Sequence, residues 1–172
     1  MSDGACGIRR WRLSDAPALA VVLSNRHVLD NLRDGLPFPY TEADAADFIS
    51  AMLASDPDAV FSFAVTEREA VAGCVGIFRG QNIHFRTAEL GYYIGEPFWG
   101  RGLATCAVRQ ACAYVFAHTD ILRIFAEPFA ENAASCRVLE KAGFVCEGVL
   151  RQNAVKNGAV RDMKMYALVR EL

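Results

Sequence analysis

The stretch FWGRGLAT, residues 98–105, joins a strand-like segment to an apolar, helix-like segment and contains two glycines and one arginine. A loop that leads into a helix N-terminus presents unpaired amide N–H groups and the positive end of the helix dipole, and both favour phosphate. Gly100, Gly102 and Ala104 remove side-chain bulk at alternate positions, and Arg101 adds a positive charge. The stretch therefore predicts a site for a phosphate-bearing ligand, with a plain tight turn as the alternative.

Other nucleotide and metal motifs fit this sequence poorly. The P-loop pattern G-x-x-x-x-G-K-[ST] is absent, and Thr105 stands where the dinucleotide fingerprint G-x-G-x-x-G needs its third glycine. The three histidines are scattered, and no histidine or cysteine spacing typical of zinc ligands occurs. No G-x-S-x-G stretch offers a serine hydrolase nucleophile. We therefore expect no metal ion, and a dinucleotide is a disfavoured ligand for the glycine loop.

The glycine loop must be positioned by a sheet before it and by a helix after it. Three β-rich runs with short turns between them precede the loop, at residues 60–67, 70–80 and 85–96, which is typical of an antiparallel meander. From Leu103 onward the apolar residues follow helical spacing, and this predicts an almost fully buried helix. The meander and the helix together would hold the loop at the edge of a core.

The rest of the chain supplies further strands and helices around this unit. We predict one mixed α/β domain over residues 1–172, with a central, mostly antiparallel twisted sheet and flanking helices. The expected elements are a strand at 8–13, a helix with Ser14 as N-cap, a helix opened by a capping box at 41–44, a strand at 121–129, a helix opened by Asn132 and closed by Gly143, and a hairpin that turns at Asn157-Gly158.

Composition narrows the class of protein. The chain has 172 residues, 53% hydrophobic and 22% charged, as in one globular domain, and its formal net charge of −2 argues against a nucleic-acid partner. The longest apolar stretch, residues 103–117, is shorter than the about 20 residues that cross a membrane. The N-terminal residues lack the long apolar segment of a signal peptide. The six cysteines include no C-x-x-C pair. We therefore expect a cytoplasmic protein with reduced thiols and no membrane association.

From TAELGYYI through FWGRGLAT to ENAASCRVLEKAGF, the chain resembles the GNAT superfamily of acetyl-coenzyme A dependent N-acetyltransferases, specifically its RimJ/RimL-type branch. The resemblance extends over nearly all of the sequence, including LPFPYTEADAADFI and GVLRQNAVKNGAVRDMKMYALV. The superfamily loop pattern [QR]-x-x-G-x-[GA] places Gly102 and Ala104 at its two small positions, whereas Trp99 stands where Gln or Arg is usual. Several ordered motifs make this resemblance more specific than the loop alone.

The resemblance implies acetyl-coenzyme A as the cosubstrate. Backbone amides of the glycine loop would bind its pyrophosphate, and the strand before the loop would pair with its pantetheine arm. Asn132 would also bond the arm, although its role as a helix cap stands beside this. Lys141 would reach the phosphates, unless it only complements the helix dipole. The implied cofactor-binding residues are Tyr93, Ile94, Gly100, Arg101, Gly102, Leu103, Ala104, Thr105, Asn132 and Lys141.

Acetyl transfer from a thioester to an amine requires a neutral amine, a polarised carbonyl and a proton for the departing thiolate. The Ile94 amide would polarise the carbonyl. Strand alternation puts Glu89 on the same face as Tyr93, so Glu89 is the candidate general base, with a salt-bridge partner as its alternative role. Many members carry a tyrosine where this chain has Leu139. The resemblance therefore suggests Ser135 as the group that meets the thiolate.

The acceptor should enter between the loop at residues 32–40 and the closing hairpin. Phe38, Tyr40 and Arg151 are the candidate substrate-binding residues, although the loop aromatics would equally suit packing onto the core. A protein N-terminal α-amine is the favoured acceptor, because it titrates at about 7.7–8.0 whereas lysine titrates at about 10.4. A small-molecule amine, such as a polyamine, amino acid or antibiotic, and a non-catalytic acyl-coenzyme A sensor are the alternatives. An exposed strand face would suit a homodimer.

Overall fold

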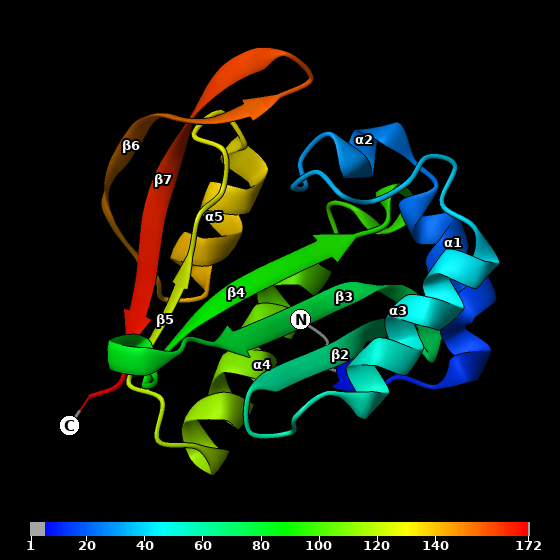
Figure 1. Cartoon of the computed structure of the whole chain (residues 1–172), viewed down its shortest axis with the longest axis horizontal. Helices are drawn as coiled ribbons and strands as arrows, with labels where there is room; N and C mark the ends of the chain where they lie inside the picture. The colour runs from blue at the N-terminus through cyan, green and yellow to red at the C-terminus, as the bar shows by residue number, and fades with distance from the viewer. Residues whose placement is uncertain (1–5, 172) are drawn as a thin grey trace.

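The computed structural model describes residues 6–171. They form one seven-stranded sheet with helices on both faces, in the strand order β1-β2-β3-β4-β5-β7-β6 (Figure 1). Neighbouring strands are antiparallel except β4 and β5, so the predicted mixed α/β fold with a mostly antiparallel sheet is confirmed. The strands are β1 (Cys6–Arg9), β2 (Val60–Glu67), β3 (Ala70–Arg79), β4 (Thr87–Ile94), β5 (Arg123–Ala126), β6 (Val145–Lys156) and β7 (Ala159–Val169).

Helices cover both faces of the sheet and divide the core into two clusters. On one face α1 and α3 pack against β2 and β3, around fully buried Leu19 and Ile49. On the other face α4 and α5 pack against the middle of the sheet, around Val108 and Leu139. The helices are α1 (Ala16–Leu23), α2 (Arg26–Leu29), α3 (Glu42–Ala54), α4 (Leu103–His118) and α5 (Ala133–Lys141), with the short 3-10 helices η1 (Leu13–Asp15), η2 (Asn82–His84) and η3 (Glu96–Phe98).

The sheet forks between β4 and β5. These two strands pair only from Thr87 to Glu89 on β4, against Arg123 to Phe125 on β5, and then diverge (Figure 1). Beyond the fork β5 pairs with β7, while β4 continues along β3 as far as Ile94. The last five residues of β4 therefore have a strand on one side only.

Local signals placed most of the helix ends correctly. Thr41 forms the expected capping box with Asp44, and Asn132 Oδ1 accepts a hydrogen bond from the Ser135 amide as an N-cap. The β6–β7 hairpin turns at Asn157-Gly158, both with positive φ. The prediction for Ser14 is wrong, because this residue lies inside η1 and does not cap α1.

Asp15 ties the first strand to the first helix. Both of its carboxylate oxygens accept hydrogen bonds from Arg9, each at 2.8 Å, and the Arg12 amide donates at 2.9 Å. The carboxylate is buried, and the Arg9 hydrogen bonds hold the pKa of Asp15 below its ordinary value despite that burial. A lowered native pKa contributes stability above the unfolded pKa, and this stability is lost as the pH falls through the native pKa.

We expect Asp15→Asn to lower the free energy of unfolding at pH 7 by about 2 kcal/mol, because a buried hydrogen-bonded charge pair is broken. The difference from the wild type should shrink below about pH 4, where the unfolded carboxyl becomes protonated. Urea denaturation at pH 7 and at pH 3 measures both. Asp47→Asn, at an exposed position of α3, is the control and should change stability little at either pH. An equal loss at both pH values would contradict the charge argument.

Candidate active site

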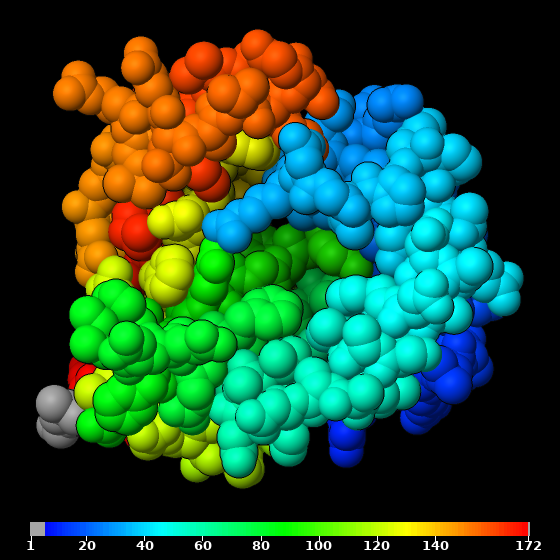
Figure 2. All heavy atoms as spheres, in the orientation of Figure 1, coloured from blue at the N-terminus to red at the C-terminus, as the bar shows by residue number. Residues whose placement is uncertain are grey.

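A cavity of about 710 Å³ opens at the fork of the sheet, within the size range of small-molecule sites. Its walls come from the free half of β4, the glycine loop, the first turn of α4, the length of α5, the residues after β5, and the segment that follows α2. Figure 2 shows this hollow beside β4, with the blue segment after α2 projecting across it. The cavity brings together segments that are far apart in the sequence.

The glycine loop enters this cavity with its amides unpaired. Gly100 and Gly102 have φ of +76° and +78°, a left-handed conformation that favours glycine, and a Cβ built on either would meet no atom within 4 Å. Gly102 is the N-cap of α4 and offers no side-chain cap. Within the described part of the chain, none of the amides from 100 to 105 has a protein acceptor. The loop thus has the features of an anion site at a helix N-terminus.

Arg101 does not supply the charge that was expected of it. Its guanidinium donates to Glu67 Oε2 at 2.7 Å and to the Pro97 carbonyl at 2.8 Å, and it lies outside the cavity. Of Arg101, only the backbone amide is therefore left as a possible donor to a phosphate. Instead, the cavity wall carries positive charge from Arg33, after α2, and from Arg137 and Lys141, which are one helical turn apart on α5. Arg137 was missed, although its spacing from Lys141 was a usable signal.

The free half of β4 presents main-chain groups to the fork. The Thr87 carbonyl accepts from the Gly80 amide, just after β3, and the Gly95 amide donates to Ala72 of β3, so the intervening even-numbered amides face away from β3. The Tyr92 and Ile94 amides are therefore directed to the side on which β5 has diverged. Trp99 Nε1 donates to the Ile94 carbonyl at 2.7 Å, which anchors the glycine loop to the end of β4. Tyr93 lines the cavity and packs against the α1–α3 cluster.

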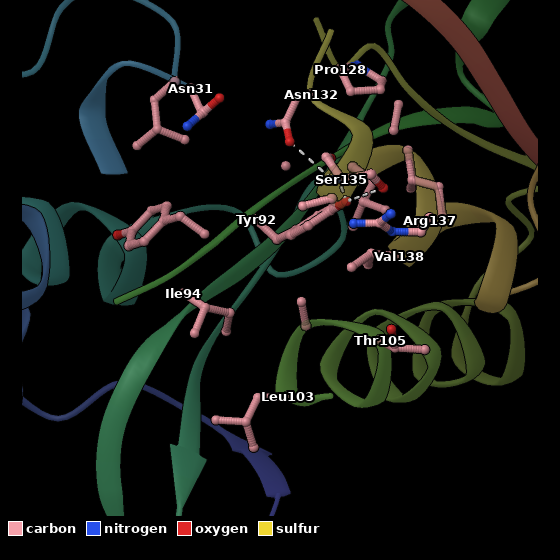
Figure 3. Close-up of a pocket in the computed structure, with 18 of the residues that line it drawn as sticks. Asn31, Tyr92, Ile94, Leu103, Thr105, Pro128, Asn132, Ser135, Arg137 and Val138 are labelled. Carbon is pink, nitrogen blue, oxygen red and sulfur yellow. Dashed lines mark hydrogen bonds between the residues drawn. The ribbon is translucent and has the colours of Figure 1, made fainter. Parts of the chain in front are cut away.

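Ser135 lies at the first turn of α5, beside a tyrosine that the sequence reasoning missed. Tyr92 Oη is 2.7 Å from Ser135 Oγ and 3.2 Å from the Ser135 carbonyl oxygen, and Asn132 caps the Ser135 amide at 3.1 Å (Figure 3). Burial raises the pKa of Tyr92 to about 12. Leu139 is fully buried in the core. Strand alternation already put Tyr92 on the face of β4 opposite Glu89, which was the available signal.

Glu89 lines the same cavity from the other face of the sheet. Its carboxylate pairs with Arg33, from the segment after α2, and the Arg33 Nη2 atom is also 3.4 Å from Glu127 Oε2. The Glu89 side chain is 33% exposed and that of Arg33 is 64% exposed. Glu127 follows β5 directly, so the two carboxylates flank the fork. The ion pair is thus present, and it leaves Glu89 open to the cavity.

The three predicted substrate-binding residues do not line the cavity. Tyr40 is buried in the α1–α3 cluster, where its hydroxyl donates to the Asp44 carbonyl at 3.3 Å and burial raises its pKa to about 12. Phe38 is exposed beneath the Arg26 guanidinium, whose carbon lies 4.0 Å from the ring centroid. Arg151 is exposed on β6. The alternative of packing onto the core therefore applies to Tyr40.

The acceptor side of the cavity is formed by the segment after α2, which includes the start of the predicted loop at residues 32–40. Asn31, Leu32 and Arg33 line it, whereas the neighbouring aspartates bond to the tip of the β6–β7 hairpin. Asp34 pairs with the buried Lys156 at 2.7 Å, and Asp30 accepts from the Asn157 amide group at 3.0 Å. The hairpin and the segment after α2 therefore meet, as Figure 1 shows for α2 and the hairpin tip.

Residues 6–171 contain no group of three or more His, Cys, Asp or Glu side chains able to hold a metal ion. None of their helices has the length and apolar character needed to cross a membrane.

Solved structures share the whole architecture. RimJ of Mycobacterium smegmatis, in complex with a coenzyme A disulfide, superposes with a TM-score of 0.85 at 25% identity, over 95% of this chain and 81% of that chain. A family model described as an acetyltransferase (GNAT) domain matches residues 6–145. The chain therefore belongs to the GNAT acetyltransferase family.

Curated relatives agree with the RimJ/RimL-type branch. A probable N-acetyltransferase of Bacillus subtilis, YjcK, is 33% identical over 68% of this chain and 65% of its own length. The ribosomal-protein-serine acetyltransferase of Escherichia coli is 30% identical over 62% and 59%. A spermidine N(1)-acetyltransferase of Vibrio cholerae is 32% identical over 56% of each chain. The matched regions thus span less than two thirds of these relatives' lengths.

Proposed function

We propose that the protein transfers the acetyl group of acetyl-coenzyme A to a primary amine, and that the favoured acceptor is the α-amine of a protein N-terminus. One observation carries the proposal. The unpaired amides at the start of α4 open into the same cavity as Glu89 and Ser135. Diphosphate binding and the groups needed for acyl transfer are thereby combined in one site.

Each step of the transfer has a residue to support it. Glu89 accepts a proton from the entering ammonium, which leaves a neutral amine to attack the thioester carbonyl. The amides of Tyr92 and Ile94 face the fork and would stabilise the negative charge on that carbonyl oxygen. As the new C–N bond forms and the C–S bond breaks, the nitrogen loses its second proton to water, and Ser135 donates a hydrogen bond to the sulfur. The thiolate then takes a proton from water, as a thiol with a pKa of about 8.5 readily does.

The choice of acceptor follows from the chemistry of the amine and from the relatives. An α-amine is partly neutral at pH 7, whereas a lysine side chain is almost wholly charged, so the α-amine asks less of the base. The relative named as a ribosomal-protein-serine acetyltransferase supports this choice. The relative named as a spermidine acetyltransferase keeps a polyamine as the second candidate. A non-catalytic acyl-coenzyme A sensor is the third.

Release of coenzyme A thiol decides among these candidates. The assay uses acetyl-coenzyme A with a peptide that has a free N-terminus and one internal lysine, the same peptide with its N-terminus acetylated, and spermidine. The proposal expects turnover with the first peptide and little with the second. Faster turnover with spermidine would establish the polyamine instead. Tight coenzyme binding without release from any amine would establish the sensor.

Arg33 should compete with the acceptor, because its guanidinium occupies the space between Glu89 and Glu127. We expect Arg33→Gln to lower the KM for the acceptor about threefold, the magnitude of an exposed ion pair, with little change in kcat. Steady-state kinetics at saturating acetyl-coenzyme A measures both constants. Arg10→Gln, at an exposed position beyond β1, is the control. An unchanged or higher KM in the Arg33 variant would show that Arg33 does not compete.

A further inference from the structure

Two hydroxyl groups meet where the coenzyme sulfur would leave. Tyr92 comes from the free half of β4, and its side chain crosses to the first turn of α5, where Oη lies 2.7 Å from Ser135 Oγ. Figure 3 shows Tyr92 and Ser135 joined by a dashed line at the wall of the cavity. The contact connects the strand edge with the residue assigned to the thiolate.

Ser135 is held through both its backbone and its side chain. Asn132 Oδ1 fixes its backbone amide at 3.1 Å, and Tyr92 contacts its hydroxyl oxygen. A serine hydroxyl has one hydrogen to donate and two lone pairs that accept. If Tyr92 donates to one lone pair, the single Ser135 hydrogen is free to point at a third group. Hydrogen bonds in such a chain strengthen one another, so the donor at its end becomes stronger.

Tyr92 is suited to the donor role. Its phenol is mostly buried beside apolar residues of α5 and α4, and that burial raises its pKa to about 12, so the proton is retained at neutral pH. Leu139 is fully buried in the core and contributes no polar group here. The hydroxyl beside Ser135 therefore comes from β4 and not from α5.

We infer that Tyr92 is a positioning residue for acyl transfer, which donates its phenolic hydrogen to Ser135 Oγ and so directs the Ser135 hydrogen to the departing sulfur. This inference rests on the proposed function. No proton leaves Tyr92. When the C–S bond breaks, its electron pair stays on sulfur, Ser135 stabilises the thiolate by a hydrogen bond, and water supplies the proton.

Kinetics of Tyr92→Phe give the first test. The variant should lower kcat about tenfold, the effect of one hydrogen bond toward a developing charge, with the acceptor KM and the coenzyme affinity nearly unchanged. In the Ser135→Ala background the same change should have almost no further effect, because Tyr92 acts through Ser135. Tyr114→Phe, at a half-exposed tyrosine of α4 outside the cavity, is the matched control. Additive losses in the double variant would overturn the inference.

Binding of a product and its desulfo analogue gives a second test that needs no turnover. Coenzyme A and desulfo-coenzyme A differ only at the sulfur, and at pH 9.5 most of the thiol is ionised, given a pKa of about 8.5. Calorimetry measures the affinity for coenzyme A divided by the affinity for desulfo-coenzyme A. In the wild type this ratio should be larger at pH 9.5 than at pH 7, a gain in preference for the thiolate. In Tyr92→Phe most of this gain should be lost.

The outcomes separate the inference from the proposed function. A gain in preference that Tyr92→Phe leaves intact would overturn the inference, even if every amine is acetylated as proposed. If no amine is acetylated but Tyr92→Phe removes the gain, the proposed function fails and the placement of Tyr92 and Ser135 against the sulfur stands. Failure of both ligands to bind at either pH would overturn both.

Discussion

Glu89→Gln is expected to lower kcat/KM for acetyl transfer at pH 7 at least about a hundredfold, the lower range for loss of a general base. The glutamine keeps the size of the side chain but accepts no proton from the entering ammonium. The variant should therefore depend on amine that is already neutral, and its defect should shrink as the pH rises past the α-amine pKa of about 8. A pH series of the steady-state rates, with an N-terminal peptide as acceptor, measures this.

Glu127→Gln is the matched control for Glu89. Both carboxylates contact Arg33 and both line the cavity, but only Glu89 is on β4 at the fork. If Glu89 acted only as a salt-bridge partner, the two variants would have similar effects. In that case Arg33→Gln would also rescue Glu89→Gln, since no unpaired cation would remain. Either result would show that Glu89 is not the general base.

Gly102→Ala is expected to weaken coenzyme A binding between about tenfold and a hundredfold, since charge-assisted hydrogen bonds from the loop amides would be lost or misaligned. The cause is the backbone, because φ at this residue is +78° and an alanine there is strained or moves the loop. Calorimetric titration with coenzyme A gives the dissociation constant directly.

The hairpin glycine offers a control with the same backbone strain. Gly158 has φ of +76°, and a Cβ there would also meet no atom within 4 Å. Gly158→Ala should therefore destabilise the fold about as much as Gly102→Ala while leaving the coenzyme affinity unchanged. Equal affinities in the two variants would show that the glycine loop does not bind the coenzyme.

Elements set by neighbouring residues could be predicted from the sequence. The caps at Thr41 and Asn132 and the turn at Asn157-Gly158 depend on contacts within three or four positions, and each is present. The apolar spacing of α4 similarly predicted its buried residues, but the expectation of an almost fully buried helix is wrong, because one face that includes Arg109, Ala113 and His118 is exposed. The glycine loop belongs to this group, since its position before a helix follows from adjacent residues.

The errors concern side chains whose partners are distant in the sequence. Arg101 turns to Glu67, 34 residues earlier. Tyr92 faces Ser135, 43 residues later, which could be known only once α5 was placed against β4. Spacing along the chain shows which face a residue occupies, but not what lies opposite that face.

The fork also determines from which side each group reaches the cavity beside β4. Glu89 approaches the cavity from one surface of the strand and Ser135 from the other, with the strand edge between them. In the proposed reaction, acetyl-coenzyme A and the amine would therefore enter the cavity from opposite surfaces of the strand, and both could be bound at once. The acetyl group would then pass directly from sulfur to nitrogen, without an acyl-enzyme intermediate.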